Sequence, residues 1–531
     1  MKKKTLAVII ISGLIMIVLV IGLIGMFRQP PVLLDDTFSS IWNTTKVSSG
    51  STGSNKVKLP LEPSGTYNFS VNWGDGTNNA IVSWDQSAVT HTYAREGVYT
   101  IYIIGTIIGW SFNNLGDKEK LIEIQQWGCL RLGNLGSNFY GCINLKITAT
   151  DMLNLTGTSN LYSTFRECKS VYKIENIGKW DVSSVTDMSY TFYQVDNFNQ
   201  DIGNWDVSSV TDMNHMFSYT TIFNQNISGW DVSSVTDMNH MFFHDIYFNQ
   251  DIGNWNVSSV TDMSGMFSGS DSFNQDIGNW EVPSVTDMSH MFLGADSFNQ
   301  DIGNWNVSSV TDMSGMFVNT FSFNKDIGNW DVSSVTDMED MFAGSIFNVA
   351  IDGWDVSSVT DMSYMFLGAD SFNQDIGNWN VSSVTDMRGM FSGADSFNQD
   401  IGNWDVSSVT HMNSMFYYTI FNQNISDWDV SSVINMNHMF YQANNFDQDL
   451  GNWDISNVRD MIDMFLNVIL SIDNYNSLLI GWSNLILYNY VIFHAGNSIC
   501  TSPGQAADAR QYIVDTFNWT IIDGQGTHSP T

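Results

Sequence analysis

FNQDIGNWNVSSVTDMSGMFSGSDS, the 25 residues from Phe248 to Ser272, recurs as near-copies through most of the chain between Trp180 and Phe465. One tryptophan marks each copy, and successive copies are 25 residues apart, except for a step of 24 after Trp330 and after Trp404. A fixed period of about 25 residues is typical of stacked repeats and is too short for a propeller blade or a two-helix repeat. The sequence therefore predicts a twelve-unit solenoid with a leucine-rich-repeat-like period. The marking residues are Trp180, Trp205, Trp230, Trp255, Trp280, Trp305, Trp330, Trp354, Trp379, Trp404, Trp428 and Trp453.

Each unit divides into two halves with different apolar spacing. The first half, from Phe248 to Val257, is interrupted by Gly253 and predicts a short strand and a turn. The second half carries Val260, Met263, Met266 and Phe267 at offsets typical of one helix face. We therefore predict a strand plus a short helical turn in every rung, with rungs stacked about 4.8 Å apart.

Stacking puts equivalent residues of successive units above one another, so each conserved position within the unit becomes a column. One column is asparagine and another is aspartate. We expect a buried amide ladder from the first and solvated helix caps from the second. The asparagines are Asn199, Asn224, Asn249, Asn274, Asn299, Asn324, Asn348, Asn373, Asn398 and Asn422. The aspartates are Asp187, Asp212, Asp237, Asp262, Asp287, Asp312, Asp337, Asp361 and Asp386.

The repeats, which read FNQDIGNWDVSSVTDMSxMF, resemble those of the BspA-like leucine-rich-repeat surface proteins, in the subgroup known as a mycoplasma-type domain of unknown function. The resemblance runs from about Leu121 to Gly524. It covers degenerate repeats at 121–179, the main array at 180–465 and a C-terminal cap at 466–531. It implies a right-handed solenoid on a cell or particle surface that binds extracellular proteins or other surfaces, and it implies no defined ligand.

Composition narrows the classes of function. The formal net charge is −35, which excludes the basic footprint that nucleic-acid binding needs. Hydrophobic residues make up 43% of the 531 residues, which is ample for a core. The chain is therefore predicted to fold, to stay soluble through charge repulsion and not to bind nucleic acid.

The first 28 residues are predicted to be an uncleaved signal anchor. Lys2, Lys3 and Lys4 precede an uncharged apolar run from Thr5 to Phe27, long enough to span a bilayer. The lysines favour an N-terminus inside and a body outside the membrane. We therefore expect a protein on a cell or particle surface, held by one transmembrane helix. Secretion after cleavage of a signal peptide is the alternative.

Two segments precede the repeats. Residues 29–60, rich in Ser, Thr, Gly and Asn, are predicted to be a linker. Residues 61–110 contain alternating strand patterns and resemble a PKD-type β-sandwich, with WGDGT at 73–77 and HTY at 91–93. Within them, Asp75 and His91 are expected to be structural residues rather than a metal or catalytic pair.

The four cysteines lack the spacing of a zinc site. Cys142 and Cys168 occupy equivalent places in adjacent units, where they would lie within disulfide range. A disulfide and a pair of free core thiols both remain open. Cys129 and Cys500 have no predicted partner.

The variable positions of the unit supply the candidate ligand contacts. His215 and His240 fall on adjacent rungs at a position that we expect to face solvent, where a shared metal ion is the less favoured alternative. Aromatic residues dominate interface hot spots. We therefore nominate the tyrosines of the loops after the Met-Phe pair: Tyr219, Tyr247, Tyr417, Tyr418 and Tyr441.

No nucleophile elbow, phosphate loop or zinc motif is present, so no catalytic, cofactor or metal residue is assigned. The leading hypothesis is a membrane-anchored extracellular protein that mediates adhesion or ligand binding through multivalent contacts of the solenoid. A structural, self-associating coat without a specific ligand is the alternative, and an enzyme ranks third.

Overall fold

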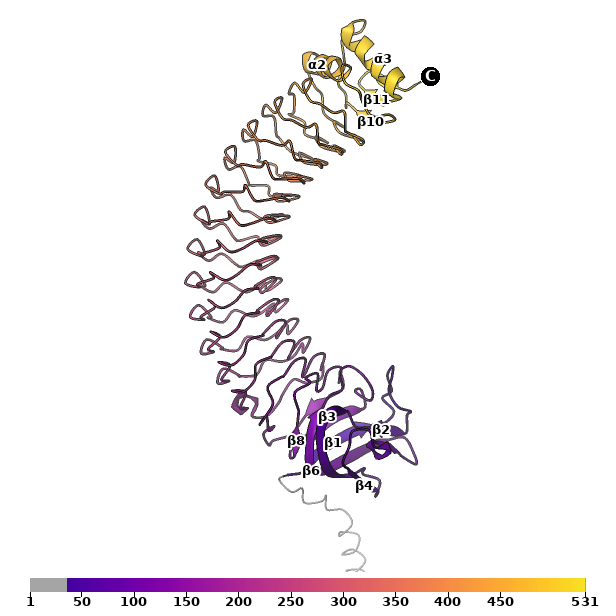
Figure 1. Ribbon diagram of the computed structural model, residues 1–531, viewed down its shortest axis with the longest axis vertical. Helices are drawn as coiled ribbons and strands as arrows, with labels where there is room; N and C mark the ends of the chain where they lie inside the picture. The colour runs from indigo at the N-terminus through magenta and orange to yellow at the C-terminus, as the bar shows by residue number, and fades with distance from the viewer. Residues whose placement is uncertain (1–35, 531) are drawn as a thin grey trace, which may run out of the picture.

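The computed structural model describes residues 36–530. Figure 1 shows an arc with β-strands at its N-terminal end, stacked turns through its middle and two helices at its C-terminal end. A seven-stranded sheet forms the N-terminal end, in the order β4-β3-β6-β1-β7-β9, with β8 paired to β6. Its strands are β1 (Phe38–Asn43), β3 (Leu61–Asn72), β4 (Asn78–Ile81), β6 (Val98–Trp110), β7 (Leu121–Gln126), β8 (Leu130–Arg131) and β9 (Lys146–Ile147). A separate pair joins β2 (Lys56–Lys58) to β5 (Thr90–Thr92), which follows the 3₁₀ turn η1 (Ser87–Val89).

This sheet corrects the prediction of a small sandwich confined to 61–110. Strands β1 and β2 lie in the predicted linker, and β7, β8 and β9 lie in the predicted degenerate repeats. Phe38 and Trp42 of β1 are fully buried, and Trp42 packs edge-on against Trp110 of β6. Two large rings in a stretch of small polar residues are enough to draw it into the core. The sheet is therefore continuous with the first repeat units.

Between Trp180 and Phe465, all of which the structure describes, there is neither an α-helix nor a strand of more than one bridge residue. Each unit is a series of overlapping turns. The N–H groups of Met266 and Ser268 donate to the carbonyls three residues earlier in the same unit, at 3.2 and 3.1 Å. The N–H groups of Met263 and Gly265 donate instead to the next unit, to carbonyls 3.0 and 2.8 Å away. Successive residues thus alternate between local turns and a parallel ladder between units.

The predicted leucine-rich-repeat-like solenoid, with a strand plus a helical turn per rung, is therefore wrong. The spacing of Val260, Met263, Met266 and Phe267 is helix-like, but Gly265 and Gly269 have φ values of +59° and +67°. A right-handed helix cannot contain such residues. The turns still bury all four apolar side chains. The short 3₁₀ turn η2 (Ile177–Lys179) precedes the array.

Equivalent residues do stack, as the repeat period predicts. Parallel bridges connect the aspartate column continuously from Asp187 to Asp386. The asparagine column is a half-buried ladder, in which the N–H of Asn274 donates to Oδ1 of Asn249 at 3.0 Å. A side chain also connects adjacent units at the tryptophan column, where Nε1 of Trp280 donates a hydrogen bond to the Ile252 carbonyl at 3.1 Å.

The spacing between adjacent units differs from one side of the stack to the other, which explains the curvature in Figure 1. The ring centroids of His215 and His240, beside the backbone ladder, are 4.8 Å apart. Ring spacing rises to 5.7–5.8 Å in the column of Phe267 and to 6.2–6.5 Å in the tryptophan column. The units are therefore closest at the backbone ladder, which lies on the inside of the arc. We call the surface made by residues 261–269 and their equivalents in the other units the concave face.

The C-terminal elements continue the last unit and cover it. They are α2 (Ile472–Trp482), β10 (Ile492–His494), α3 (Gln505–Phe517), β11 (Thr520–Asp523) and β12 (Gly526–His528). Phe493 of β10 forms a parallel bridge with Met461 of the last unit. Trp482 of α2 donates its Nε1–H to the Leu450 carbonyl at 3.2 Å, as the repeat tryptophans do one unit earlier. The apolar end of the stack is thereby closed.

The predicted signal anchor, residues 1–28, lies outside the described residues. Among residues 36–530, no helix is both long and apolar enough to cross a bilayer. The structure therefore gives no support to the predicted membrane anchor or to the surface localisation that depended on it.

Candidate functional site

Four of the five tyrosines nominated from the sequence lie on the concave face. Tyr219 and Tyr418 occupy the position of Gly269, and Tyr417 and Tyr441 occupy the adjacent position of Ser268. Tyr247 is different, because it corresponds to Ser272 in the following turn, where its side chain is 57% exposed. The structure thus brings four tyrosines to one surface and separates the fifth from them.

A continuous cluster of rings covers the N-terminal part of the concave face. Its members, which we call the N-terminal aromatic patch, are Tyr190, Tyr193, His215, Tyr219, His240, Phe243 and His244. Tyr190 stacks on His215 at 4.4 Å, and His215 stacks on His240 at 4.8 Å. In the neighbouring column, Tyr219 lies 5.8 Å from Tyr193 and stacks on His244 at 5.2 Å. Phe243 bridges the columns, with its ring 4.9 Å from His240 and 5.2 Å from Tyr219.

A smaller cluster lies near the C-terminal end of the same face. We call Tyr417, Tyr418, His438 and Tyr441 the C-terminal aromatic patch. Tyr417 stacks on Tyr441 at 4.8 Å and contacts Tyr418 at 4.7 Å. His438 lies 5.6 Å from Tyr441, and its Nε2 is 3.5 Å from the carboxylate of Asp463. Both patches therefore combine tyrosine with histidine at equivalent positions of the unit.

Several of these aromatic residues have an unfavourable backbone conformation. Tyr219, His244 and Tyr418 have φ values of +57°, +54° and +55°. Side chains at positive φ cost about 1 kcal/mol or more relative to glycine. In five other units the same position holds glycine: Gly269, Gly294, Gly344, Gly368 and Gly393. The patches thus keep bulky rings where the backbone geometry favours glycine.

His215 and His240 do not form a metal site. Their rings are nearly parallel, at 10°, so they stack face to face and their nitrogens do not converge on one point. No group of three His, Cys, Asp or Glu residues suited to a metal ion occurs within residues 36–530. Burial, together with the neighbouring His240, lowers the pKa of His215 to about 4. Both imidazoles are half-buried, so the prediction that this position faces solvent is only partly correct.

The aspartate column runs along the concave face beside the aromatic columns. Its residues are not helix caps, since each carboxylate accepts the N–H two residues later, as Asp212 does from Asn214 at 3.0 Å. Asp212 is half-buried, and desolvation with the nearby charges of Asp237 and Asp187 raises its pKa to about 6. We call this column the acidic row, and at Asp212 ionisation of the carboxyl group opposes folding.

Asp212→Asn should stabilise the protein at pH 7 and not at pH 3.5. A raised carboxyl pKa means that the folded state holds its proton longer, so stability falls as pH rises from about 4 to about 6. The shift corresponds to about 3 kcal/mol, and discounting for solvent screening of this half-exposed group leaves about 1 kcal/mol. Asparagine retains the turn, because Asn435 in the same column accepts the Asn437 N–H at 3.0 Å. Urea denaturation at both pH values measures the effect.

Asp231→Asn is the matched control. The carboxylate of Asp231 is exposed, and hydrogen bonds from Ser233 lower its pKa. Its ionised form therefore favours folding, and the substitution should give no stabilisation at pH 7. Equal stabilisation by both substitutions would contradict the conclusion that ionisation of Asp212 opposes folding.

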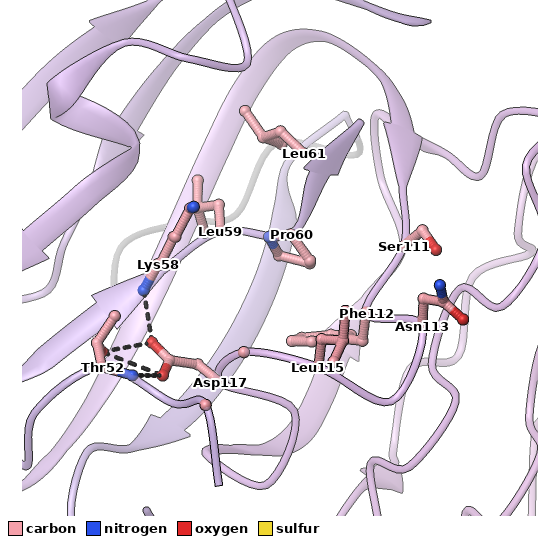
Figure 2. Close-up of a pocket in the computed structure, with 12 residues that line it drawn as sticks. Thr52, Lys58, Leu59, Pro60, Leu61, Ser111, Phe112, Asn113, Leu115 and Asp117 are labelled. Atoms are coloured by element: carbon pink, nitrogen blue, oxygen red, sulfur yellow. Dashed lines mark hydrogen bonds between the residues drawn. The ribbon is translucent and has the colours of Figure 1, made fainter. Parts of the chain in front are cut away.

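The cavity in Figure 2, about 350 Å³, lies beside the N-terminal sheet, between residues 50–61 and residues 111–117. Apolar side chains line it, including Leu59 and Phe112. Its acidic residue, Asp117, is saturated by the backbone N–H groups of Thr52 and Lys58, both at 2.7 Å, and by buried Lys120 at 3.0 Å. Asp117 therefore ties Thr52 and Lys58 to the chain at 117, and the cavity offers no unpaired carboxylate to a ligand.

Two other groups considered in the sequence lie in or beside the buried core. Oδ2 of Asp75 lies 2.8 Å from Nε2 of His91, whose ring stacks on Trp73 in the core of the N-terminal sheet. All four cysteines are free thiols. Sγ of Cys168 donates to the Phe139 carbonyl at 3.0 Å, and burial raises the pKa of the thiols of Cys142 and Cys168.

No pattern in the sequence pointed to Arg166, which borders the N-terminal aromatic patch, because the degenerate repeats at 121–179 lack the regularly spaced tryptophans that set the register. Tyr190, Tyr193 and Phe243 were also missed. They lie in variable loops like the nominated tyrosines, and only the register of neighbouring units shows that they meet.

Residues 159–258, 242–348, 344–420 and 417–483 match the family described as "Mycoplasma protein of unknown function, DUF285". No curated protein and no solved structure matches the chain. The four matches follow one another through the degenerate repeats, the array and the start of the cap, and together they span more than half of the chain. The chain therefore belongs to this DUF285 family.

Proposed function

We propose that this protein is a non-enzymatic binding protein whose concave face holds a partner protein, with the two aromatic patches as its main anchors. The observation that carries the proposal is the grouping of Tyr219, His244 and Tyr418 with other rings on the concave face, at a positive-φ position where five other units have glycine and four have glutamine or asparagine. Strained residues that persist despite an unstrained alternative are typical of functional sites. Core packing does not explain the positive φ of these residues, because none of the three side chains is buried in the core.

The patches have the chemistry of interface hot spots. Tyrosine supplies a large contact area with few rotatable bonds. The stacked neighbours of Tyr219 and Tyr417 restrict those bonds further before any partner arrives. Less side-chain entropy is then lost on binding. The patches are therefore preorganised for contact with a protein surface.

The acidic row defines the charge of the partner. It runs unbroken from Asp187 to Asp386, alongside the N-terminal aromatic patch and on toward the C-terminal one, in a chain with a net charge of −35. Complementary charges accelerate encounter and exclude unsuitable partners. The proposed partner therefore presents a basic surface, and its binding should weaken as salt rises.

The repeat supports attachment at several points. Two patches on one rigid face allow a partner that engages one of them to find the other at high effective concentration. The resemblance of the repeats to those of BspA-like surface proteins agrees with a role in adhesion to extracellular proteins or cell surfaces. A self-associating coat is less favoured, because two copies of so acidic a face repel each other.

The proposal predicts that Tyr219→Gly together with Tyr418→Gly abolishes most binding and preserves the fold. Glycine removes the rings and relieves the positive φ, so the variant should remain as stable as the parent. Losing two hot spots of at least 1 kcal/mol each should weaken binding by more than tenfold. Saturable binding of residues 36–531 to intact cells and to immobilised matrix proteins, measured in a salt series, provides the test.

Tyr247→Ser is the control, because Tyr247 is exposed outside the patches and the equivalent residue in the next unit is Ser272. It should leave binding unchanged. If the double glycine variant binds as well as the parent, the aromatic patches are not the anchors. Absence of binding by any form, with self-association in light scattering, would favour the coat.

A further inference from the structure

Arg166 stands beside the N-terminal aromatic patch and is enclosed by tyrosine rings. Its guanidinium carbon lies 4.7 Å from the ring centroid of Tyr140, 4.8 Å from that of Tyr190 and 4.7 Å from that of Tyr193. Tyr140 and Tyr193 occupy the same column in the units before and after Arg166. The guanidinium is therefore held by cation–π contacts along the axis of the stack.

The hydrogen-bonding capacity of this guanidinium is unused. Its two terminal amino groups have no acceptor among residues 36–530, and Nε is buried without a hydrogen-bond partner. The nearest carboxylate, that of Glu167, is 3.8 Å from Nε, beyond hydrogen-bonding distance. The side chain is 22% exposed. Arginine stacked on aromatic faces keeps its in-plane donors available.

Two other arginines of the chain are paired with carboxylates. Arg388 lies 2.7 Å from the carboxylate of Asp386, and Arg510 lies 2.7 Å from that of Asp523. Arg459 resembles Arg166 in that it forms no ion pair among residues 36–530 and lies over a tyrosine ring, that of Tyr488 at 4.8 Å, but its guanidinium contacts one ring and not three. The hydroxyl groups of Tyr140, Tyr190 and Tyr193 also have no hydrogen-bond partner within the described chain. Burial raises the pKa of Tyr190 and Tyr193, so both remain O–H donors.

We propose that Arg166, framed by Tyr140, Tyr190 and Tyr193, is a binding site for a ligand carboxylate group. The fork of a guanidinium matches the two oxygens of a carboxylate, and three phenol groups add neutral donors around it. A small cation is excluded, because the aromatic cage already contains the guanidinium. The acidic row beside the site repels a phosphate dianion more strongly than a carboxylate, which carries one charge. This site is independent of the proposed function, since it requires no protein partner.

The test is saturation-transfer NMR of sodium acetate with the whole protein at constant ionic strength. The parent should bind acetate saturably, and Arg166→Lys should weaken binding at least tenfold, because lysine keeps the charge and loses the planar fork. Arg388→Lys, at an arginine already paired with Asp386, should bind as the parent does. Inorganic phosphate should compete poorly. N-acetylglutamate and glucuronate, compared with acetate, distinguish an amino-acid from a sugar carboxylate as the natural source.

Unchanged acetate binding in Arg166→Lys, or no saturable binding by the parent, would overturn the proposal. Should Arg166→Lys perturb the fold, Tyr190→Phe with Tyr193→Phe retains the rings and removes two hydroxyl donors. This variant should weaken acetate binding about threefold, and an unaltered affinity would rule out the tyrosine hydroxyls as part of the site. A negative result for acetate binding at Arg166 does not bear on partner binding, which the glycine variants of Tyr219 and Tyr418 test separately.

Discussion

Replacing Asp245 by threonine is expected to raise the free energy of unfolding at pH 7 by about 2 kcal/mol, the cost of a buried unsatisfied polar group. The side chain of Asp245 is 0% exposed, and neither carboxylate oxygen has a hydrogen-bond partner. In the adjacent units, the equivalent hydroxyls of Thr220 and Ser270 donate to the Phe192 and Phe242 carbonyls at 2.8 and 2.6 Å. Threonine at 245 should make the same bond to the carbonyl of Phe217.

The gain from Asp245→Thr should depend on pH. Burial raises the pKa of Asp245 well above its ordinary value of 3.8, so the folded state keeps a proton that the unfolded state releases. Stability is therefore lost as pH rises above about 4, and threonine removes this loss. Urea denaturation from pH 4 to pH 8 should show a benefit that grows with pH. Asp296→Thr, at an exposed aspartate, should change stability by less than about 0.5 kcal/mol. Destabilisation by Asp245→Thr at pH 7 would contradict this account.

Replacing Phe292 by alanine is expected to lower the free energy of unfolding by about 3–5 kcal/mol, the range for large core aromatics. The ring is fully buried and stacks on Phe298 at 3.9 Å within its own unit. It also stacks on Phe267 and Phe317, each 5.8 Å away in the units before and after. Loss of one ring therefore weakens both interfaces with neighbouring units.

Hydrogen exchange measures this effect locally, because a repeat array opens in segments. Protection should fall most for the amides of the units on either side of Phe292. Phe321→Ala removes a ring that is 55% exposed and should alter protection little. Equal effects of the two substitutions would show that the stacked phenylalanine column does not hold adjacent units together.

The repeat period predicted which residues stack, and the chain of bridges from Asp187 to Asp386 confirms it. The content of each unit was predicted wrongly because the spacing of Met263, Met266 and Phe267 fits a helix as well as a series of turns. Only the acceptors in the next unit decide between them, and these are not visible in one unit of sequence. Histidines, glycines and other residues occupy the column aligned with Gly265, and all have positive φ. The glycines were a signal of this conformation, but the variety of the other residues concealed it.

The candidate site was predicted by residue type and not by arrangement. Tyr219, Tyr417, Tyr418 and Tyr441 were found because loops after each Met-Phe pair vary. Their grouping into two patches depends on lateral contacts between columns. The half-burial of Asp212 arises from packing between adjacent units, which one unit of sequence does not contain.

Hydroxyl-radical footprinting of the protein bound to a basic partner tests the central claim most directly. Tyr219 and Tyr418 on the concave face should lose reactivity when the partner is present. Tyr247 and Tyr172, which are 57% and 61% exposed at other positions of the unit, should react as before. Protection of Tyr247 and Tyr172, with Tyr219 and Tyr418 unchanged, would show that binding uses another surface and would contradict the account.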